Sequence, residues 1–165
     1  MPSSTPKAFT AAVITVSDSR SRGTHTDTSG PALADLLRKR NFSVVGTEIV
    51  PDERANIEKA ILHWVREARF VLTTGGTGVA ERDVTPEATR AVCDRLLEGV
   101  AERMRSAGHQ KTPLAILSRG ICGICQRSIV LNLPGSPNGA VESLESVIDV
   151  IPHALKLLAG ETEHG

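Results

Sequence analysis

Short apolar runs rich in β-branched residues alternate with helical patterns through the first half of the chain. Strands are predicted over 9–16, 42–50 and 69–74, and helices near 31–40 and 51–68. A strand that is followed by a helix and then by another strand is typical of βαβ units, whose strands are parallel. We therefore expect an α/β fold with three layers, in which helices cover both faces of a mainly parallel sheet.

The second half of the chain predicts that this sheet is mixed. Apolar runs near 114–124 and 127–133 are close enough to form a hairpin, which would add an antiparallel strand. Residues 137–159 are expected to be helical, with a break near Pro152. Further helices are expected near 85–92 and 99–108, and further strands near 114–118 and 128–134.

Three predicted helices have candidate caps in the sequence. Thr28 or Ser29 is the candidate N-cap of the first helix, and Asp52 that of the second. Thr85 is the candidate for the third, where Pro86 would take the first helical position.

The composition fits one domain with an aliphatic core. The chain has 165 residues, of which 40% are hydrophobic, with three Phe, one Trp and no Tyr. Val, Ile, Leu and Ala must therefore fill the core, which suits an α/β layer fold better than an aromatic-rich β-sandwich. We expect a disordered N-terminal tail over residues 1–8 and a single domain over 9–160.

Charge and composition indicate a small-molecule partner. The formal net charge is zero, whereas nucleic-acid binders usually have a basic excess, so no nucleic-acid partner is expected. The N-terminus lacks the long apolar stretch of a signal peptide, and we expect no membrane span. Three cysteines, an odd number, argue against a disulfide scaffold and for a reducing compartment. We therefore expect a cytoplasmic protein.

Cys122 and Cys125 form a CxxC pattern inside a β-rich run. A zinc site needs two more ligands, and the sequence has no second CxxC and no HxxxH. A thioredoxin-type motif begins a helix after a strand, which is not the context here. We therefore expect neither a redox nor a metal role for this pattern.

A glycine-rich loop is the first candidate for a binding site. Residues 73–78 read TTGGTG and follow a predicted buried strand. In doubly wound folds ligands bind beyond the carboxyl ends of strands, and successive N–H groups in a glycine loop form an anion-binding nest. The motif is neither a lysine P-loop nor GxGxxG, so those mechanisms do not transfer. A structural turn and a phosphate cradle both remain open.

Two aspartates follow predicted strands near this loop. Asp83 comes after the glycines, and Asp52 follows the strand over 42–50. A carboxylate beside a phosphate cradle repels the ligand unless a cation lies between them, and Mg²⁺ removes that conflict. If the two strands are neighbours, both acids leave the same edge of the sheet. The alternatives are a turn aspartate at 83 and a helix cap at 52.

Two further segments follow strands toward the same expected edge. Residues 17–30 are rich in hydroxyl groups, and they either line the rim of a site or form a mobile loop. Residues 131–140, LNLPGSPNGA, run from a strand through a rigid turn into a helix. That turn either presents Ser136 and backbone N–H groups to a ligand or only connects two elements.

Taken together and in order, these segments resemble the Mog/MoaB proteins of molybdenum-cofactor biosynthesis. The same domain occurs in the molybdopterin-adenylylating part of gephyrin and in its plant counterpart. The pair TTGGTG and RDVTPEAT is highly specific, and the similarity covers most of the chain. The matching stretches are TVSDS…TDTSGP (15–31), IVPDE (49–53), VLTTGGTG…RDVTPEAT (71–89), LSR…CGI (117–124) and LNLPGSP (131–137).

The resemblance implies a Mog-like fold, usually trimeric, and molybdopterin adenylyltransferase activity. ATP and molybdopterin would give adenylyl-molybdopterin and pyrophosphate with Mg²⁺, and the product would pass to a molybdate-inserting domain or protein. The terminal phosphate of molybdopterin would attack the α-phosphate of ATP, so no protein nucleophile is needed. That agrees with the lack of a Ser-His-Asp arrangement, because such transfer depends on positioning and charge neutralisation.

The resemblance also implies roles for single residues. Asp52 and Asp83 would be catalytic and would organise Mg²⁺. The glycine loop would cradle the nucleotide. The residues implied to bind nucleotide or molybdopterin are Ser17, Asp18, Thr74, Gly75, Gly76, Thr77, Gly78, Ser118, Arg119, Pro134, Gly135 and Ser136.

The chain departs from the family pattern in two places. Family members commonly have Pro-Gly before the segment equivalent to 100–105, where this chain has Glu-Gly, although the acid Glu102 is kept. They also commonly read Gly-Ile-Arg-Gly-Lys, whereas residues 123–127 read Gly-Ile-Cys-Gln-Arg. Cys125 thus replaces a basic side chain. If that side chain contacts an anionic group, the affinity for substrate is lower here.

Two other functions are compatible with the sequence. One is a non-catalytic molybdopterin-binding module, since the fold also serves other activities within longer proteins. The other is a scaffold that acts only by forming a trimer. The presence of both Asp52 and Asp83 favours the enzyme, because a scaffold would leave the acidic pair unexplained.

Overall fold

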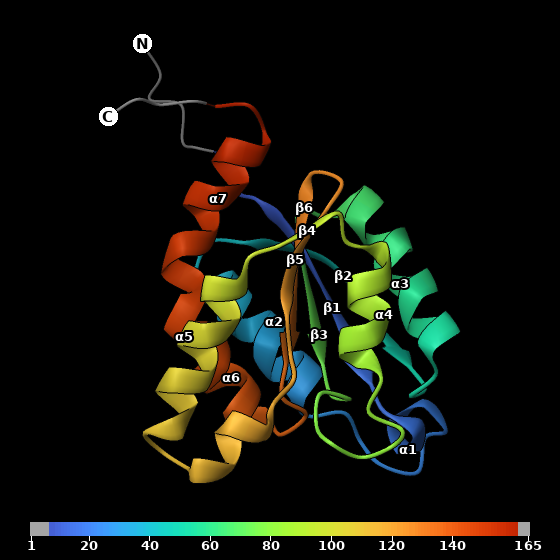
Figure 1. The fold of residues 1–165 in the computed structure, drawn as a ribbon. Helices are drawn as coiled ribbons and strands as arrows, with labels where there is room; N and C mark the ends of the chain where they lie inside the picture. The colour runs from blue at the N-terminus through green and yellow to red at the C-terminus, as the bar shows by residue number, and fades with distance from the viewer. Residues whose placement is uncertain (1–6, 162–165) are drawn as a thin grey trace.

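The computed structural model describes residues 7–161, and its centre is a six-stranded sheet (Figure 1). The strands are β1 (Thr10–Val16), β2 (Ser43–Val50), β3 (Phe70–Thr74), β4 (Arg95–Leu96), β5 (Cys122–Cys125) and β6 (Ser128–Leu133). They lie in the order β2-β1-β3-β6-β5-β4. β2, β1, β3 and β6 form parallel pairs, whereas β5 runs antiparallel to both β6 and β4.

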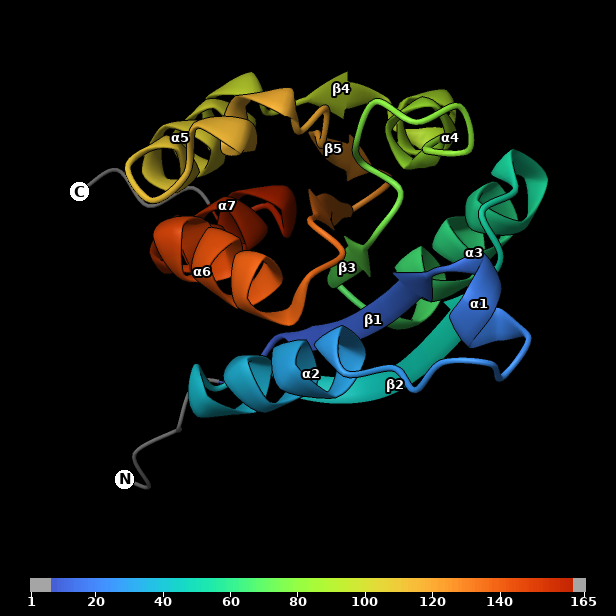
Figure 2. The same cartoon turned by 90° about the horizontal axis from the view of Figure 1, so that it is seen from below.

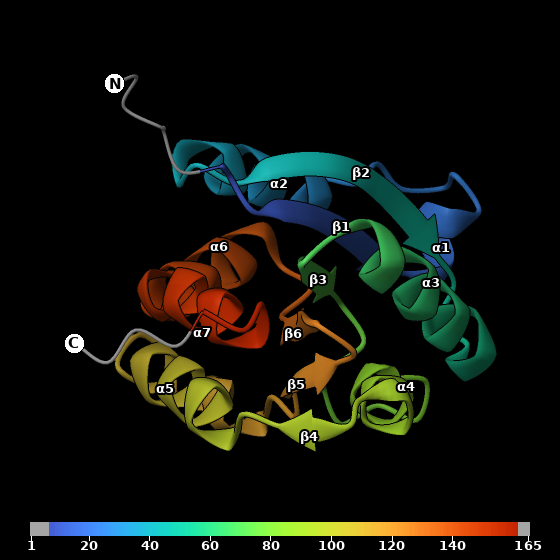
Figure 3. The ribbon, with the colours of Figure 1, turned by 90° about the horizontal axis from the view of Figure 1, so that it is seen from above.

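Helices cover both faces of the sheet and complete three layers (Figure 2). α2, α5, α6 and α7 lie on one face, and α3 and α4 lie on the other, as the view from the opposite end also shows (Figure 3). The helical segments are α1 (Asp18–Ser21), α2 (Ser29–Lys39), α3 (Arg54–Glu67), α4 (Thr85–Val92), α5 (Glu98–His109), η1 (Pro113–Leu117), α6 (Pro137–Val147), η2 (Ile148–Val150) and α7 (Ile151–Leu158).

The two faces of the sheet support two separate hydrophobic cores. Successive side chains of a strand point to opposite faces, so Leu72 packs with Leu144 of α6, and Val71 packs with Ile61 of α3. All five residues of β3 are buried, because helices cover both of its faces. This confirms the α/β fold with three layers and a mainly parallel, mixed sheet.

The prediction of a strand over 114–118 is wrong, because the 3-10 helix η1 occupies this stretch. Thr112 accepts a hydrogen bond from the Leu114 N–H at 3.3 Å, and Pro113 begins the turn. Leu114 is 70% exposed, which a buried strand would not allow. The antiparallel partner of β6 is instead β5, so the predicted hairpin exists but its first strand starts later in the chain.

Two predicted helix caps are also wrong. Asp52 does not cap α3, whose N-cap residue is Glu53 without a side-chain bond. Thr85 is the first residue of α4 rather than its N-cap, and Pro86 is the second residue rather than the first. Both side chains instead bond to loops at the edge of the sheet. Thr28 takes the N-cap position of α2, which begins at Ser29, but its side chain makes no capping bond.

The other differences from the predicted elements are small. The short helix α1 and the two-residue strand β4 were not predicted. The predicted break near Pro152 is confirmed, since η2 separates α6 from α7 there. Most of the tail predicted over 1–8 lies outside the described residues, and the domain bounds 9–160 stay a prediction. No helix among the described residues is both long and apolar enough to cross a membrane.

Candidate active site at the carboxyl edge of the sheet

The loops that follow β1, β2, β3 and β6 meet at one edge of the sheet, at the lower end of the strands in Figure 1. Backbone hydrogen bonds tie them together: the Ser17 N–H donates to Val50 at 2.9 Å, and the Gly75 N–H donates to Leu133 at 3.1 Å. β2 and β3 are not neighbours, because β1 lies between them. Since all three strands are parallel, the segments holding Asp52 and the glycine loop still reach the same edge.

The glycine loop adopts a backbone that only glycine accepts readily. Gly75 has a φ of 103° and Gly76 a φ of 70°. A Cβ on Gly75 would collide with the carbonyl oxygen of Val16, and one on Gly76 would collide with the hydroxyl of Thr85. Thr85 also donates its hydroxyl to the Gly75 carbonyl at 2.9 Å. The start of α4 therefore fixes the shape of this loop.

The N–H groups of the loop are available to a ligand. Within residues 7–161, no group accepts a hydrogen bond from the N–H groups of Gly76, Thr77 or Gly78. All three residues line a cavity of about 770 Å³. Successive free N–H groups in such a loop attract anions.

Asp52 and Asp18 hold the neighbouring loops together by a reciprocal pair of hydrogen bonds. The Asp18 N–H donates to Asp52 Oδ2 at 3.0 Å, and the Asp52 N–H donates to Asp18 Oδ1 at 2.9 Å. Asp18 also accepts two hydrogen bonds from the guanidinium group of Arg82, at 2.6 and 3.0 Å. These bonds with Arg82 lower the pKa of the Asp18 carboxyl group. Arg82 thus secures the far end of the glycine loop, a role that sequence reasoning missed.

Within residues 7–161, no cation forms an ion pair with the Asp52 carboxyl group. Burial raises its pKa first, and the negative charges of Asp18 and Asp83 raise it further. Its Oδ1 lies 3.2 Å from the point where a Cβ on Gly76 would stand. A partly buried carboxylate therefore faces the glycine loop.

Asp83 approaches the loop from its other end. Its Oδ2 accepts a hydrogen bond from the Ala80 N–H at 3.1 Å, and the side chain lines the cavity. A Cβ on Gly78 would stand 2.8 Å from the same oxygen. Asp52 thus lies beside Gly76 and Asp83 beside Gly78, although only Asp83 also lines the cavity.

Arg119 supports the loop from outside the cavity. Its guanidinium group donates to the carbonyls of Gly78 at 2.8 Å and Asp83 at 2.6 Å, and it pairs with both carboxylate oxygens of Glu87. Its backbone N–H donates to the Thr77 carbonyl at 2.8 Å. Arg119 does not line the cavity, so its contacts indicate that it positions the loop.

The Pro134–Ser136 turn forms another wall of the cavity. Thr74 is buried and donates its hydroxyl to the Pro134 carbonyl at 2.6 Å, which fastens this turn to β3. Ser136 caps α6 by accepting a hydrogen bond from the Gly139 N–H at 3.2 Å. Ser17 caps α1 in the same way and does not line the cavity. Capping does not prevent a hydroxyl from also bonding to a ligand.

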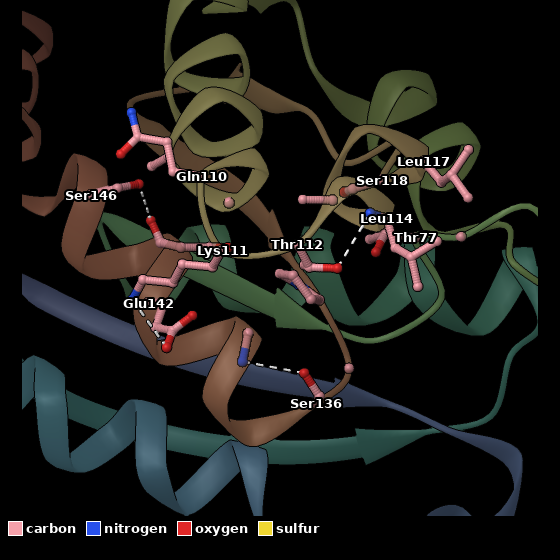
Figure 4. A pocket seen from close by; sticks show the side chains of 18 of the residues that line it. Thr77, Gln110, Lys111, Thr112, Leu114, Leu117, Ser118, Ser136, Glu142 and Ser146 are labelled. Atoms are coloured by element: carbon pink, nitrogen blue, oxygen red, sulfur yellow. Dashed lines mark hydrogen bonds and ion pairs between the residues drawn. The ribbon is translucent and has the colours of Figure 1, made fainter.

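The cavity has a second half that sequence reasoning did not find. Figure 4 shows Gln110, Lys111 and Thr112, from the turn between α5 and η1, opposite Glu142 and Ser146 of α6. Lys111 and Glu142 form an ion pair at 3.1 Å across this half. No motif marks these positions, because they come together only when α5 packs against α6. The predicted residues that do line the cavity are Gly76, Thr77, Gly78, Asp83, Ser118, Pro134, Gly135 and Ser136.

The fold and this edge define an α/β protein with a cavity beyond the carboxyl ends of its parallel strands. The cavity volume suits a ligand of nucleotide or drug size, because the pockets that bind such ligands usually measure about 300–1,000 Å³. The chain belongs to the family described as the probable molybdopterin binding domain, which it matches over residues 12–153.

Relatives and solved structures agree with this family. The chain is 42% identical over 152 residues to the molybdopterin adenylyltransferase of Helicobacter pylori strain J99, covering 90% of this chain and 86% of the relative. It is 39% identical over 164 residues to that of Escherichia coli K12, covering 90% and 84%. The crystal structure of the molybdopterin biosynthesis enzyme MoaB from Thermus thermophilus matches with a TM-score of 0.87 at 49% identity, covering 92% of this chain and 97% of that one.

Proposed function

We propose that this chain is a molybdopterin adenylyltransferase, an enzyme of molybdenum-cofactor biosynthesis that uses Mg-ATP. The observation that supports this most is that Asp52 and Asp83 both lie beside one glycine loop with free N–H groups. Relatives named for this activity are matched over most of their length.

In the proposed reaction, a terminal phosphate oxygen of molybdopterin attacks the α-phosphorus of ATP. A new P–O bond forms, the bond between the α- and β-phosphates breaks, and pyrophosphate leaves with the electron pair. The N–H groups of Gly76, Thr77 and Gly78 stabilise phosphate charge, because fixed dipoles need no reorganisation during the reaction. No protein nucleophile takes part, so the residues act by positioning and by neutralising charge.

The residues at this edge fit a magnesium ion. Within residues 7–161, no group of three His, Cys, Asp or Glu side chains is arranged to hold a metal ion. Mg²⁺ does not need such a group, because it is commonly held by one or two carboxylates together with substrate phosphates and water. Asp52 and Asp83 would hold it, and its charge would offset the repulsion that raises the pKa of Asp52. When bound, it neutralises phosphate charge.

The resemblance supports two further parts of the proposal. The chain would act as a homotrimer in the cytoplasm. Its product would pass to a molybdate-inserting partner. The cavity supports a third part: its second half, around Lys111 and Glu142, would hold molybdopterin while the glycine loop holds the nucleotide.

The deciding experiment mixes the purified chain with molybdopterin, ATP and MgCl₂ and detects adenylyl-molybdopterin by mass spectrometry. Asp83→Asn keeps the size of the side chain and should reduce the rate by at least about 100-fold, the usual effect of removing a charge-stabilising group. Asp35→Asn, which changes an exposed acid of α2 that pairs with Arg38, is the matched control and should keep full activity. If the native chain binds molybdopterin but forms no product, it is a binding module instead.

A further inference from the structure

One face of α6 lines the cavity and presents an acid to it. Gly139, Glu142, Ser143 and Ser146 all line the cavity. Their positions, three, four and seven residues after the first, place them on one side of the helix. Glycine has no side chain and serine has a short one, so Glu142 has the longest side chain on this side of α6.

Lys111 faces this acid from the turn between α5 and η1 (Figure 4). Its Nζ lies 3.1 Å from Oε1 of Glu142. Backbone hydrogen bonds fix the turn, because the Gly108 carbonyl accepts from the N–H groups of Lys111 and Thr112, both at 3.0 Å. The two charged groups therefore meet at one end of the cavity from two separately held segments.

The ion pair is open to a ligand. The Lys111 and Glu142 side chains are 60% and 46% exposed, and both residues line the cavity. An exposed ion pair contributes little to stability, so either group can turn to a ligand at little cost. The pair places hydrogen-bond donors beside two acceptor oxygens, since an ammonium group only donates and a carboxylate only accepts.

The two ends of the cavity therefore favour different chemical groups. The N–H groups of the glycine loop attract an anion, whereas Glu142 attracts N–H donors. α6 begins beside the glycine loop, since a Cβ on Gly135 would stand 3.4 Å from the Gly75 Cα. From Ser136 to Glu142 the helix rises about 9 Å. A ligand with a phosphate at the glycine loop therefore meets Glu142 only with a part distant from that phosphate.

We propose that Glu142 and Lys111 recognise the edge of the pterin ring of molybdopterin, an inference that rests on the proposed function. A pterin presents two donors in a row, the 2-amino group and N3–H, followed by the acceptor O4. The Glu142 carboxylate accepts from both donors, and the Lys111 ammonium group donates to O4, which gives charge-assisted hydrogen bonds. The edge of adenine has one amino group beside an acceptor nitrogen, so it does not match. The pair therefore selects the pterin over the adenine for this end of the cavity.

The test compares two rings that differ at one position. The 6-carboxy derivatives of pterin and lumazine have an amino and an oxo group at C2, respectively, and both have O4. Each competes with molybdopterin for the folded full-length chain in anaerobic equilibrium dialysis without ATP. The pterin should compete at least about 10-fold better, because a site that hydrogen-bonds to an N–H group rejects an analogue without it.

Variants of the ion pair separate its two roles. Glu142→Gln should weaken molybdopterin binding by about 10- to 100-fold and remove the preference for the pterin, because the new amide places an N–H group against a ring donor. Lys111→Met should weaken binding of both rings equally and keep the preference, since both have O4. Asp149→Asn is the matched control: it breaks an exposed ion pair with Arg103 outside the cavity and should behave as the native chain does.

The proposal is overturned if the native chain prefers neither ring or if Glu142→Gln keeps the preference. It is also overturned if Glu145→Gln, which changes the other acid of α6 that lines the cavity, loses the preference instead. A chain that binds molybdopterin through Glu142 but forms no adenylylated product would contradict the proposed activity and support this inference. A chain that forms the product while Glu142→Gln keeps the preference would do the reverse.

Discussion

Asp52 is held at the glycine loop by reciprocal hydrogen bonds with Asp18, while burial and the neighbouring acids raise the pKa of its carboxyl group. A carboxyl pKa that is higher in the folded chain than in the unfolded chain means that the ionised form disfavours folding. Below the unfolded pKa, the carboxyl group is protonated in both the folded and the unfolded chain, and the folded chain has its full stability. As the pH rises through the folded pKa, the group ionises in the folded chain as well, and this part of the stability is lost. The acid therefore reduces stability at neutral pH when no cation is bound.

Asp52→Asn should therefore raise the Tm in magnesium-free buffer at pH 7 and greatly reduce adenylyl transfer. The amide keeps an oxygen to accept the Asp18 N–H, so the local hydrogen bond survives. Thermal unfolding across pH measures the difference from the native chain, which should grow as the pH rises through the raised pKa of Asp52. A variant less stable than the native chain at pH 7 would show that the charge of Asp52 does not disfavour folding.

Single residues differed in how well the sequence identified them. The glycines and both acids could be placed, because each lies in a loop that follows a strand, and parallel strands end at a common edge. Arg82 and Lys111 could not, because their roles depend on contacts with residues 18 and 142, far along the chain. Charged side chains are common on surfaces, so no local pattern distinguishes these two.

Among the elements, α4 has the most direct connection to the site. Thr85 is fully buried, donates its hydroxyl to Gly75, and donates its N–H to the Gly76 carbonyl at 3.1 Å. Thr85→Val removes the hydroxyl and leaves a buried carbonyl without this partner, which should reduce the free energy of unfolding by about 1–3 kcal/mol. Urea unfolding measures the change, with Thr85→Ser as the matched control that keeps the hydroxyl. Equal losses in both variants would assign the effect to packing instead.

The segment from Gly78 to Asp83 should depend on Arg119 in a similar way. Arg119→Met removes the bonds to both carbonyls and to Glu87, so the backbone amides of this segment should exchange with deuterium faster than in the native chain. Glu87→Gln leaves the two carbonyl bonds in place and should have the smaller effect. Unchanged exchange in Arg119→Met would mean that the loop keeps its shape without this support.

The elements show why helix starts are difficult to predict. Asp52 and Thr85 are typical capping residues, yet both bond to other loops, because tertiary partners compete with the local N–H groups. Asp27 was not predicted to cap a helix, yet it accepts a hydrogen bond from the Gly30 N–H in the first turn of α2 at 3.0 Å. It also accepts one from the distant Thr15 hydroxyl at 2.8 Å. The sequence did not identify Asp27 as a capping residue, because it lies among many other polar residues in the loop over 17–30.

For the whole molecule, the proposed ligand should appear as a change in stability. ATP with Mg²⁺ should raise the Tm more than ATP alone, because a ligand that binds only the folded chain stabilises it more as its concentration rises relative to its Kd. The gain should fall as the pH falls through the raised pKa of Asp52, since only the ionised carboxylate would hold the metal. Differential scanning fluorimetry measures both effects, and Asp52→Asn should remove the magnesium-dependent part. A gain equal with and without magnesium would argue against metal binding at this edge.

The layered architecture was the most predictable property of the whole molecule. Alternating strand and helix patterns leave few arrangements other than a sheet covered on both faces. The strand order was less accessible: β2 and β3 follow each other in the sequence, but β1 separates them, and β6 lies beside β3. Packing between distant segments decides this order, and it also builds the half of the cavity between α5 and α6.

The position of β6 has a consequence for how the protein is made. Residues 128–133 lie in the middle of the sheet, yet a ribosome makes them only after about three quarters of the chain. Until then β3, with all five residues apolar or Thr, has an unpaired edge on the side that β6 will occupy. Such an edge is open to pairing with other chains, so the nascent protein is most prone to aggregate before residues 128–133 have been made. A chain cut short before residue 128 should be insoluble and should lack the site altogether.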